Sequence, residues 1–136
     1  MIKNVYINLP VADVAASERF FAALGLEADP AFSDERTLAL RLSETVVAML
    51  LRRDRFAEFT DRPVADASET TAALVALQLE SRAAVDAMFD AALAAGGAEP
   101  RPAEEHGFMY GRAFSDPDGH IWEPFWFDAE AAAKAS

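Results

Sequence analysis

A chain of 136 residues that is 52% hydrophobic, contains ten Phe and bears a net charge of −11 has the composition of a folded globule, which excludes a disordered segment. The negative charge disfavours nucleic acid and anionic membrane surfaces as partners, because both would repel it. The chain has no Cys, which excludes disulfides, thiol nucleophiles and thiolate metal sites. The length fits one compact domain or two small halves that share a core.

Neither a secretory signal nor a membrane span is visible. The segment 1–17, MIKNVYINLPVADVAAS, has no basic region followed by a long apolar run. No stretch approaches 18 uninterrupted apolar residues. We therefore expect a soluble cytoplasmic protein, whose acidity either maintains solubility or attracts a cationic ligand.

The first half of the chain reads as a strand, a helix and a pair of strands. Ile2–Leu9 alternates and is rich in β-branched residues, as strands are. Asp13 can cap a helix that ends near Gly25. The runs RTLALRLS (36–43) and TVVAMLLR (45–52) predict paired strands.

The segment 56–71, FAEFTDRPVADASETT, lacks periodicity and reads as a linker. A segment of this length in a small domain is often a lid or a dimer arm. Its residues favour neither role over the other.

The second half repeats the plan of the first. A strand that ends at Leu79 leads to Ser81, which can cap a helix from Arg82 to about Ala95. Gly96 and Gly97 end this helix. The pattern then predicts short strands near 98–102, 107–115 and 120–127, followed by a helical tail capped by Asp128.

The two halves also resemble each other directly. ERFFAALGLEADP (Glu18–Pro30) and DAMFDAALAAGGAEP (Asp86–Pro100) share Phe, Ala-Ala-Leu, Gly, an acidic residue and Pro in the same order. A strand-like run precedes each of them. We therefore expect two homologous βαβββ modules, which span 1–55 and 72–128, joined by the linker 56–71 and followed by the tail 129–136.

The chain resembles the vicinal oxygen chelate superfamily, which includes glyoxalase I, bleomycin-resistance proteins and extradiol dioxygenases. The resemblance covers residues 1–128 and rests on INLPVADVAASERFFAALG near the start and FSDPDGHIWE near the end. It implies an α+β fold in which two βαβββ modules form an eight-stranded curled sheet around a cleft. It also implies a homodimer, to which Trp122, Trp126 and the linker could contribute.

The same resemblance locates the positions that bind metal in the glyoxalases. They fall on Tyr6 and Met49 in the first module and on Leu74 and Glu123 in the second. A divalent ion needs several N or O ligands, and this set offers one carboxylate and a phenol. We therefore expect no metal and no other cofactor, and a cleft that these side chains line.

Glu123 is the acidic residue of an otherwise apolar strand, and such carboxylates usually have a partner or a task. Alternation groups Glu123 with Ile121 and Phe125 on the cleft side, and it turns Trp122 and Trp126 toward helices or a partner subunit. Two interpretations stay open. Glu123 is a general base or ligand acceptor, or it is a structural residue bonded to backbone or to Arg112.

Further residues have both a functional and a structural interpretation. Tyr110 and Arg112 share parity with Phe108 and Phe114, and they line the cleft if that face is inward, or else belong to a core stripe. Asn8 shares parity with Tyr6 and is either a cleft amide or a strand-end residue. His106 is an exposed loop residue or a proton-transfer group, and His120 is a turn residue.

The run RRDRF (52–56) reads as a solvated strand end or as a clasp for an anionic group. No phosphate-binding loop or Ser-His-Asp order is visible. The favoured function is a metal-free protein that binds a small organic molecule in its cleft, with possible lyase or isomerase activity on a carbonyl substrate. The alternatives are a sequestering protein of the bleomycin-resistance type and a metal enzyme with other ligands.

Overall fold

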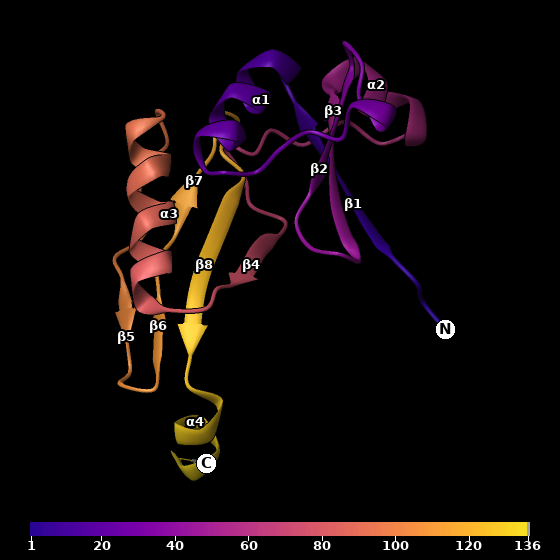
Figure 1. Cartoon of the computed structure of the whole chain (residues 1–136). Helices are drawn as coiled ribbons and strands as arrows, with labels where there is room; N and C mark the ends of the chain where they lie inside the picture. Colours follow the sequence, from indigo (N-terminus) through magenta and orange to yellow (C-terminus); the bar gives the residue numbers. More distant parts are fainter. Residues whose placement is uncertain (136) are drawn as a thin grey trace. The chain divides into compact units, whose positions relative to one another are not determined.

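The computed structural model describes residues 1–135, which form eight β-strands and four α-helices and confirm the expected α+β class (Figure 1). The chain divides into two compact units, one from Met1 to Asp66 and the other from Ala67 to the C-terminus. Each unit has its own sheet and its own long helix. The units are described separately below.

Unit 1 is a three-stranded sheet with the order β1-β3-β2. Strand β1 runs parallel to β3, and β2 runs antiparallel to it. The strand expected after the helix is reduced to one bridge, Ala28 with Leu40. The elements of unit 1 are β1 (Val5–Val11), α1 (Val14–Ala23), η1 (Pro30–Phe32), β2 (Thr37–Arg41), β3 (Val46–Arg52), α2 (Arg53–Phe56) and η2 (Ala57–Phe59).

Helix α1 begins and ends where the sequence predicts. The Asp13 carboxylate accepts hydrogen bonds from the backbone N–H groups of Ala15 (3.0 Å) and Ala16 (3.3 Å), which satisfies two of the donors left free at a helix start. Gly25 follows the helix with a φ of 85°, a conformation that glycine adopts without strain. The buried side chains of Phe20 and Phe21 fix the helix in the core of unit 1.

Unit 2 is a five-stranded sheet in which β4, β8, β6 and β5 are consecutive neighbours and β7 also pairs with β8. Strand β4 runs parallel to β8, so each unit pairs its first and last strands in the same way. Helix α3 lies along this sheet (Figure 1). The elements of unit 2 are β4 (Leu74–Gln78), α3 (Arg82–Ala94), β5 (Glu104–Glu105), β6 (Met109–Gly111), β7 (Phe114–Ser115), β8 (Ile121–Phe127) and α4 (Ala129–Ala135).

The expected strand 107–115 is present as β6 and β7, interrupted at residues 112–113. The register does not change across the break, since Gly111 lies opposite Phe125 and Phe114 lies opposite Trp122. The Arg112 N–H still donates to the Pro124 carbonyl at 3.0 Å, but Pro124 has no N–H to return the bond. A proline in the middle of β8 therefore removes one rung from an otherwise continuous ladder.

The strands are divided three and five between the units, where the repeat predicts four and four. The expected strand 98–102 is reduced to one bridge between Ala98 and Ser115, matching the Ala28 bridge of unit 1. Strand β5 forms instead at Glu104–Glu105. Pro100 and Pro102 lie in the segment that fails to pair, and neither can donate a backbone hydrogen bond to a ladder.

The turn before β8 is built around a buried carboxylate. Asp116 is 5% exposed and accepts hydrogen bonds from the indole N–H of Trp122 (3.0 Å) and from the backbone N–H groups of Asp118 (2.9 Å) and His120 (3.1 Å). Burial raises its pKa, and the hydrogen bond from Trp122 partly offsets that effect. The Asp-Pro-Asp-Gly turn thus fixes the indole of Trp122 in the core.

Removing this carboxylate should destabilise the protein. Asp116→Ala leaves the buried indole N–H of Trp122 and two part-buried backbone N–H groups without this acceptor, and an unsatisfied buried donor costs roughly 1–3 kcal/mol. We expect the free energy of unfolding to fall by at least about 2 kcal/mol, measured by urea denaturation. Asp90→Ala, at an exposed position of α3, should change it by less than about 0.5 kcal/mol. Equal stability of the two variants would contradict the role given to Asp116.

The start of α3 is tied to the edge of the sheet by Arg82. Its guanidinium pairs with Glu105 of β5, with Nη2 2.7 Å from Oε1, and donates to the Gly107 carbonyl at 2.8 Å. It also lies 5.1 Å from the centroid of the Trp126 ring, within cation–π range. The hydrogen bond from Arg82, followed by that from the Gly107 N–H, lowers the pKa of Glu105 to about 2.

A carboxyl titration tests this contact. Because the folded-state pKa of Glu105 lies below its ordinary 4.5, the contact contributes stability above pH 4.5 and loses it as the pH falls toward about 2. We expect the Glu105 carboxyl carbon to titrate in NMR spectra with a midpoint near 2. Arg82→Gln should move that midpoint up toward 4.5. Arg19→Gln, which changes an exposed residue of α1 in the other unit, should leave the midpoint unchanged. A wild-type midpoint near 4.5 would contradict the pairing.

Candidate functional site

The candidate site is a pocket of about 390 Å³ on the sheet of unit 2, here called the Glu123 pocket. Its volume lies within the range of roughly 300–1,000 Å³ that small-molecule sites occupy. Its walls combine apolar side chains with a few charged groups. The lining residues are Ala76, Arg101, Glu104, Met109, Gly111, Arg112, Glu123, Pro124 and Phe125.

Strand register determines which side chains face this pocket. Ala76 of β4 lies opposite Glu123, and Gly111 of β6 lies opposite Phe125. Because directly paired residues project to the same side of a sheet, these four share one face. Leu74 pairs with Ile121 on that face and is 55% exposed. The predicted grouping of Glu123 with Ile121 and Phe125 therefore follows from the observed pairing.

Glu123 forms an ion pair with Arg101. The Glu123 side chain is 17% exposed, and its Oε2 accepts from Nη2 of Arg101, whose side chain is 36% exposed. The other terminal nitrogen of Arg101 donates to Glu104 of β5 at 3.1 Å. One loop guanidinium thus bridges two carboxylates. The side-chain partner of Glu123 is Arg101, and not Arg112, which the structural interpretation named as one option beside the backbone.

Tyr110 does not face the pocket. It pairs with Trp126, on the side of the sheet opposite Glu123, and its hydroxyl donates to Asp86 of α3 at 2.5 Å. This hydrogen bond raises the pKa of Tyr110, and burial adds to the effect. The expectation that Tyr110 belongs to the cleft is therefore wrong. Its neighbours Met109 and Gly111 point toward the pocket instead.

Arg112 lies along one wall of the pocket, but its guanidinium is engaged with the helix side. The guanidinium carbon lies 3.6 Å from the centroid of the Phe89 ring of α3, and the terminal nitrogens contact Asp86 (3.4 Å) and Glu99 (3.1 Å). Its Nε is buried without a hydrogen-bond partner. Arg112 therefore shapes the pocket wall, while its charge is directed to Asp86 and Glu99.

The large aromatic residues of unit 2 form its core on the helix side. Phe114 and Trp122 face each other across β7 and β8 and are fully buried. Arg82 of α3 lies over the Trp126 ring. Both tryptophans therefore lie on the side of the sheet that faces α3, which is one of the two directions that the sequence left open. Phe108 is 36% exposed and is not part of this core.

Unit 1 has a smaller pocket of about 80 Å³ on the corresponding face of its sheet. Tyr6 and Met49, which the resemblance places in a cleft, both line it. Asn8 lies opposite Met49 in the register and is exposed, so its amide shares this face. The remaining lining residues are Asp29, Phe32, Ala39, Arg41 and Val47.

The side chains at the expected metal positions do not supply the donors of a metal site. Tyr6 offers a phenol, Met49 a thioether and Leu74 no donor, while the carboxylate of Glu123 is paired with Arg101. Within residues 1–135, no three His, Asp or Glu side chains cluster as metal ligands would. A divalent ion of the glyoxalase type requires several N or O ligands, and this set does not fit it.

The two histidines have different surroundings. His106 lies in the loop between β5 and β6, and its side chain is 58% exposed with Nε2 3.8 Å from Glu104. It thus lies close to a residue of the pocket rim. His120 belongs to the Asp116 turn, where its backbone N–H is bound by the Asp116 carboxylate. This contact agrees with the interpretation of His120 as a structural residue of the turn.

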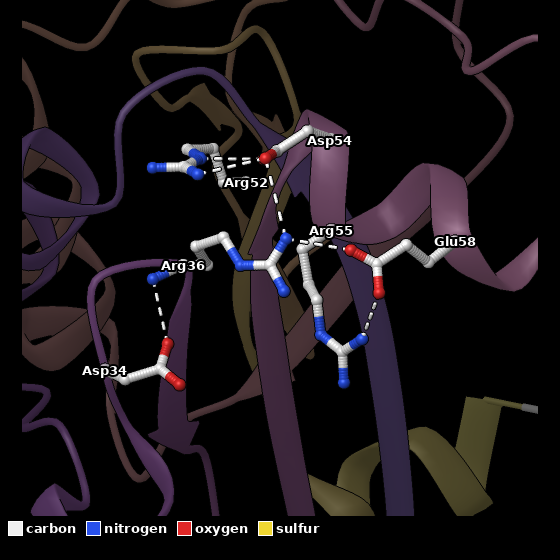
Figure 2. Close-up of polar contacts among 6 residues, drawn as sticks. All are labelled: Asp34, Arg36, Arg52, Asp54, Arg55 and Glu58. Carbon is white, nitrogen blue, oxygen red and sulfur yellow. Dashed lines mark hydrogen bonds and ion pairs between the residues drawn. The ribbon is translucent and has the colours of Figure 1, made fainter.

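The arginines of the RRDRF segment are paired with neighbouring groups, as Figure 2 shows for Arg52 and Arg55. Arg52 contacts Asp54 at 2.7 Å, and Arg55 contacts Glu58 at 2.6 Å. Arg53 donates to the carbonyls of Val64 and Ala65 at 3.0 and 2.9 Å. These contacts favour the interpretation of the segment as a solvated strand end over its interpretation as a binding site for an anionic group.

The sequence reasoning missed six of the residues that line the pocket: Ala76, Arg101, Glu104, Met109, Gly111 and Pro124. Arg101 pairs with Glu123 across 22 residues, and no local pattern signals such a contact. Met109 and Gly111 were passed over because their parity was assigned to the outer face. The large apolar residues at 108, 110 and 114 were the available signal, since such a stripe usually marks the core side of a strand.

No described helix has the length and apolar character needed to cross a membrane.

A comparison with curated proteins found no match. Solved structures do match the fold. A hypothetical protein from S. aureus is 22% identical with a TM-score of 0.78, and covers 93% of this chain and 94% of its own. A glyoxalase-related enzyme from Fulvimarina pelagi is 25% identical with a TM-score of 0.76, covering 93% and 88%.

A family enzyme from Burkholderia phytofirmans, described as glyoxalase/bleomycin resistance protein/dioxygenase, is 16% identical with a TM-score of 0.74, covering 90% of this chain and 97% of its own. The sequence model of that family matches residues 3–123, which is most of the chain. The repeated βα units and the turn before β8 lie within the matched range. The chain belongs to the glyoxalase/bleomycin resistance protein/dioxygenase superfamily.

Proposed function

We propose that this protein binds a small organic molecule in the Glu123 pocket. The observation behind the proposal is a shielded carboxylate, Glu123, on a pocket face that also carries the apolar side chains of Ala76, Met109 and Phe125. Pockets with apolar walls and a few fixed polar groups are typical sites for small organic ligands, which they orient through those groups. On the corresponding face of unit 1 the pocket measures about 80 Å³, which is too small for most such ligands.

Binding without a metal fits the donor set better than metal chemistry does. The one carboxylate at the expected metal positions already has a cationic partner in Arg101. A metal would have to displace that guanidinium and would still lack further N or O ligands. The similar structures carry names of enzymes and of resistance proteins alike, so the names leave catalysis open.

A second candidate function is a lyase or isomerase reaction on a carbonyl substrate. The adjacency of Glu123 and Arg101 favours it. Glu123 could accept a proton from the carbon next to the carbonyl, while Arg101 donates hydrogen bonds to the oxygen on which negative charge develops. Exchange of that proton for solvent deuterium, lost in Glu123→Gln while binding persists, would distinguish this reaction from binding alone.

We also propose the homodimer that the resemblance implies. The buried indole of Trp122 cannot contribute to its interface, because its exposed fraction is 0%. The exposed apolar side chains of Val5 and Tyr6 on β1 are better candidates, since apolar area is what subunit interfaces bury. Light scattering on the purified full chain measures the subunit number directly.

Filling the pocket should abolish binding without unfolding the protein. A Cβ atom at Gly111 would meet its nearest atoms at 3.5–3.8 Å, which is ordinary contact, so Gly111→Ala should fold and bind normally. Gly111→Leu projects a larger side chain into the pocket and should prevent binding. The measurement is an NMR screen of a fragment library of mixed charge, mapped by amide shifts of pocket residues.

The screen has clear criteria. We expect fragment-induced shifts at Ala76, Met109 and Phe125 in the wild type and in Gly111→Ala, and their loss in Gly111→Leu. Ala76→Leu fills the same pocket from β4 and serves as a second blocking variant if Gly111→Leu does not fold. Fragments that bind elsewhere, or that bind equally to the blocked variants, would refute the proposed function.

A further inference from the structure

We infer that the ligand of the Glu123 pocket is an organic amine in its protonated form, whose ammonium group replaces the guanidinium of Arg101 on Glu123. This inference rests on the proposed function and specifies its ligand class. Arg101 then acts as an internal substitute for the ligand: it neutralises the shielded carboxylate while the pocket is empty. The exchange is of one cation for another, so Glu123 is never left without a counter-charge.

The two partners of the ion pair differ in how firmly they are held. Glu123 lies within β8, which has β4 on one side and β6 and β7 on the other. Arg101 lies outside any strand, between the bridge at Ala98 and β5, and its side chain is about twice as exposed, 36% against 17%. Displacing the loop arginine therefore costs less than moving the strand carboxylate.

Arg101 keeps a partner when it leaves Glu123. Its other terminal nitrogen is 3.1 Å from Glu104, a carboxylate on the exposed edge strand β5. A displaced guanidinium can stay paired with Glu104 and move into solvent together with it. The exchange therefore leaves no buried unpaired charge, which is the costly outcome in such rearrangements.

The charges around the pocket favour a cation. At the pocket, the guanidinium of Arg101 faces two carboxylates, Glu104 and Glu123. The whole chain has a net charge of −11. An anionic ligand would have to compete with both carboxylates for Arg101 and enter a negative field. An ammonium group would instead be attracted by the negative field and could pair with the Glu123 carboxylate.

The rest of the pocket face defines the remainder of the ligand. Met109 and Phe125 present a thioether chain and an aromatic ring beside Glu123, and the small residues Ala76 and Gly111 leave room between them. Such a surface accommodates an apolar ring or chain attached to the amine. A volume of about 390 Å³ fits an amine with one or two rings.

Two sets of matched probes test the inference on the full chain. The first set is benzylamine, benzyl alcohol and benzoate, and the second is the cyclohexyl series with the same three groups. Affinities at pH 7 come from NMR titrations monitored at pocket amides. We expect the amines to bind at least about tenfold more tightly than the alcohols, as a charge-assisted hydrogen bond in a shielded site allows, and the carboxylates to bind more weakly still.

Variants separate the two charged groups. Glu123→Gln should weaken amine binding by about tenfold or more, because it removes the anchor. Arg101→Gln should strengthen amine binding by about threefold or more, because it removes the competitor, and a misfolded protein would not produce such a gain. Glu99→Gln, which alters a carboxylate bound to Arg112 and not to Arg101, should leave the affinity within about twofold.

Two results would overturn the inference. Tight binding of the carboxylate probes that Arg101→Gln abolishes would make Arg101 the anchor of an anionic ligand. Equal affinities of amine and alcohol, unaffected by either variant, would show that the ion pair does not select the ligand. In both cases a small molecule still occupies the pocket, so the proposed function stands. Loss of all pocket binding in the mixed-charge screen refutes both proposals.

Discussion

The architecture of unit 2 depends on the position of β8 between two neighbours. Parallel pairing with β4 and antiparallel pairing with β6 and β7 fix both edges of this strand, so that its side chains alternate between two defined environments. Trp122 goes to the core and Glu123 to the opposite face. The Asp116 turn fixes where this alternation begins, because its carboxylate binds the Trp122 indole. Burial of one aromatic residue thereby places the carboxylate that follows it.

The chemistry of the site follows from what surrounds that carboxylate. The family resemblance implies a metal ligand at this strand position, and here the partner of the carboxylate is a guanidinium from a loop. An ion pair has looser geometric requirements than metal coordination, and either partner can be exchanged for a group of like charge. The fold is therefore that of its superfamily, while the charged groups in the pocket lining include Arg101, Glu104 and Glu123.

Periodicity and cap residues were sufficient to predict most elements. Asp13 and Ser81 mark the true starts of α1 and α3, since each side chain binds the first backbone donors of its helix. Contacts distant in sequence were not predictable in this way. The parity of Tyr110 and Arg112 is evident from the sequence, but which of the two faces meets α3 is decided by Asp86 and Phe89, on another element. The pairing of Arg101 with Glu123 likewise exists only once the sheet has formed.

Pro124, next to Glu123, weakens the attachment of β8 to the β6–β7 side of the pocket at one point. Because the proline has no N–H, the ladder between β8 and the β6–β7 side lacks one bond at this point, while the register on both sides of it is intact. Separating these strands here breaks fewer hydrogen bonds than separating them elsewhere along the ladder. At this point the wall formed by Met109 and Gly111 is consequently held by one hydrogen bond fewer, and a ligand of the kind proposed above would displace it without disturbing the pairing of β4 with β8.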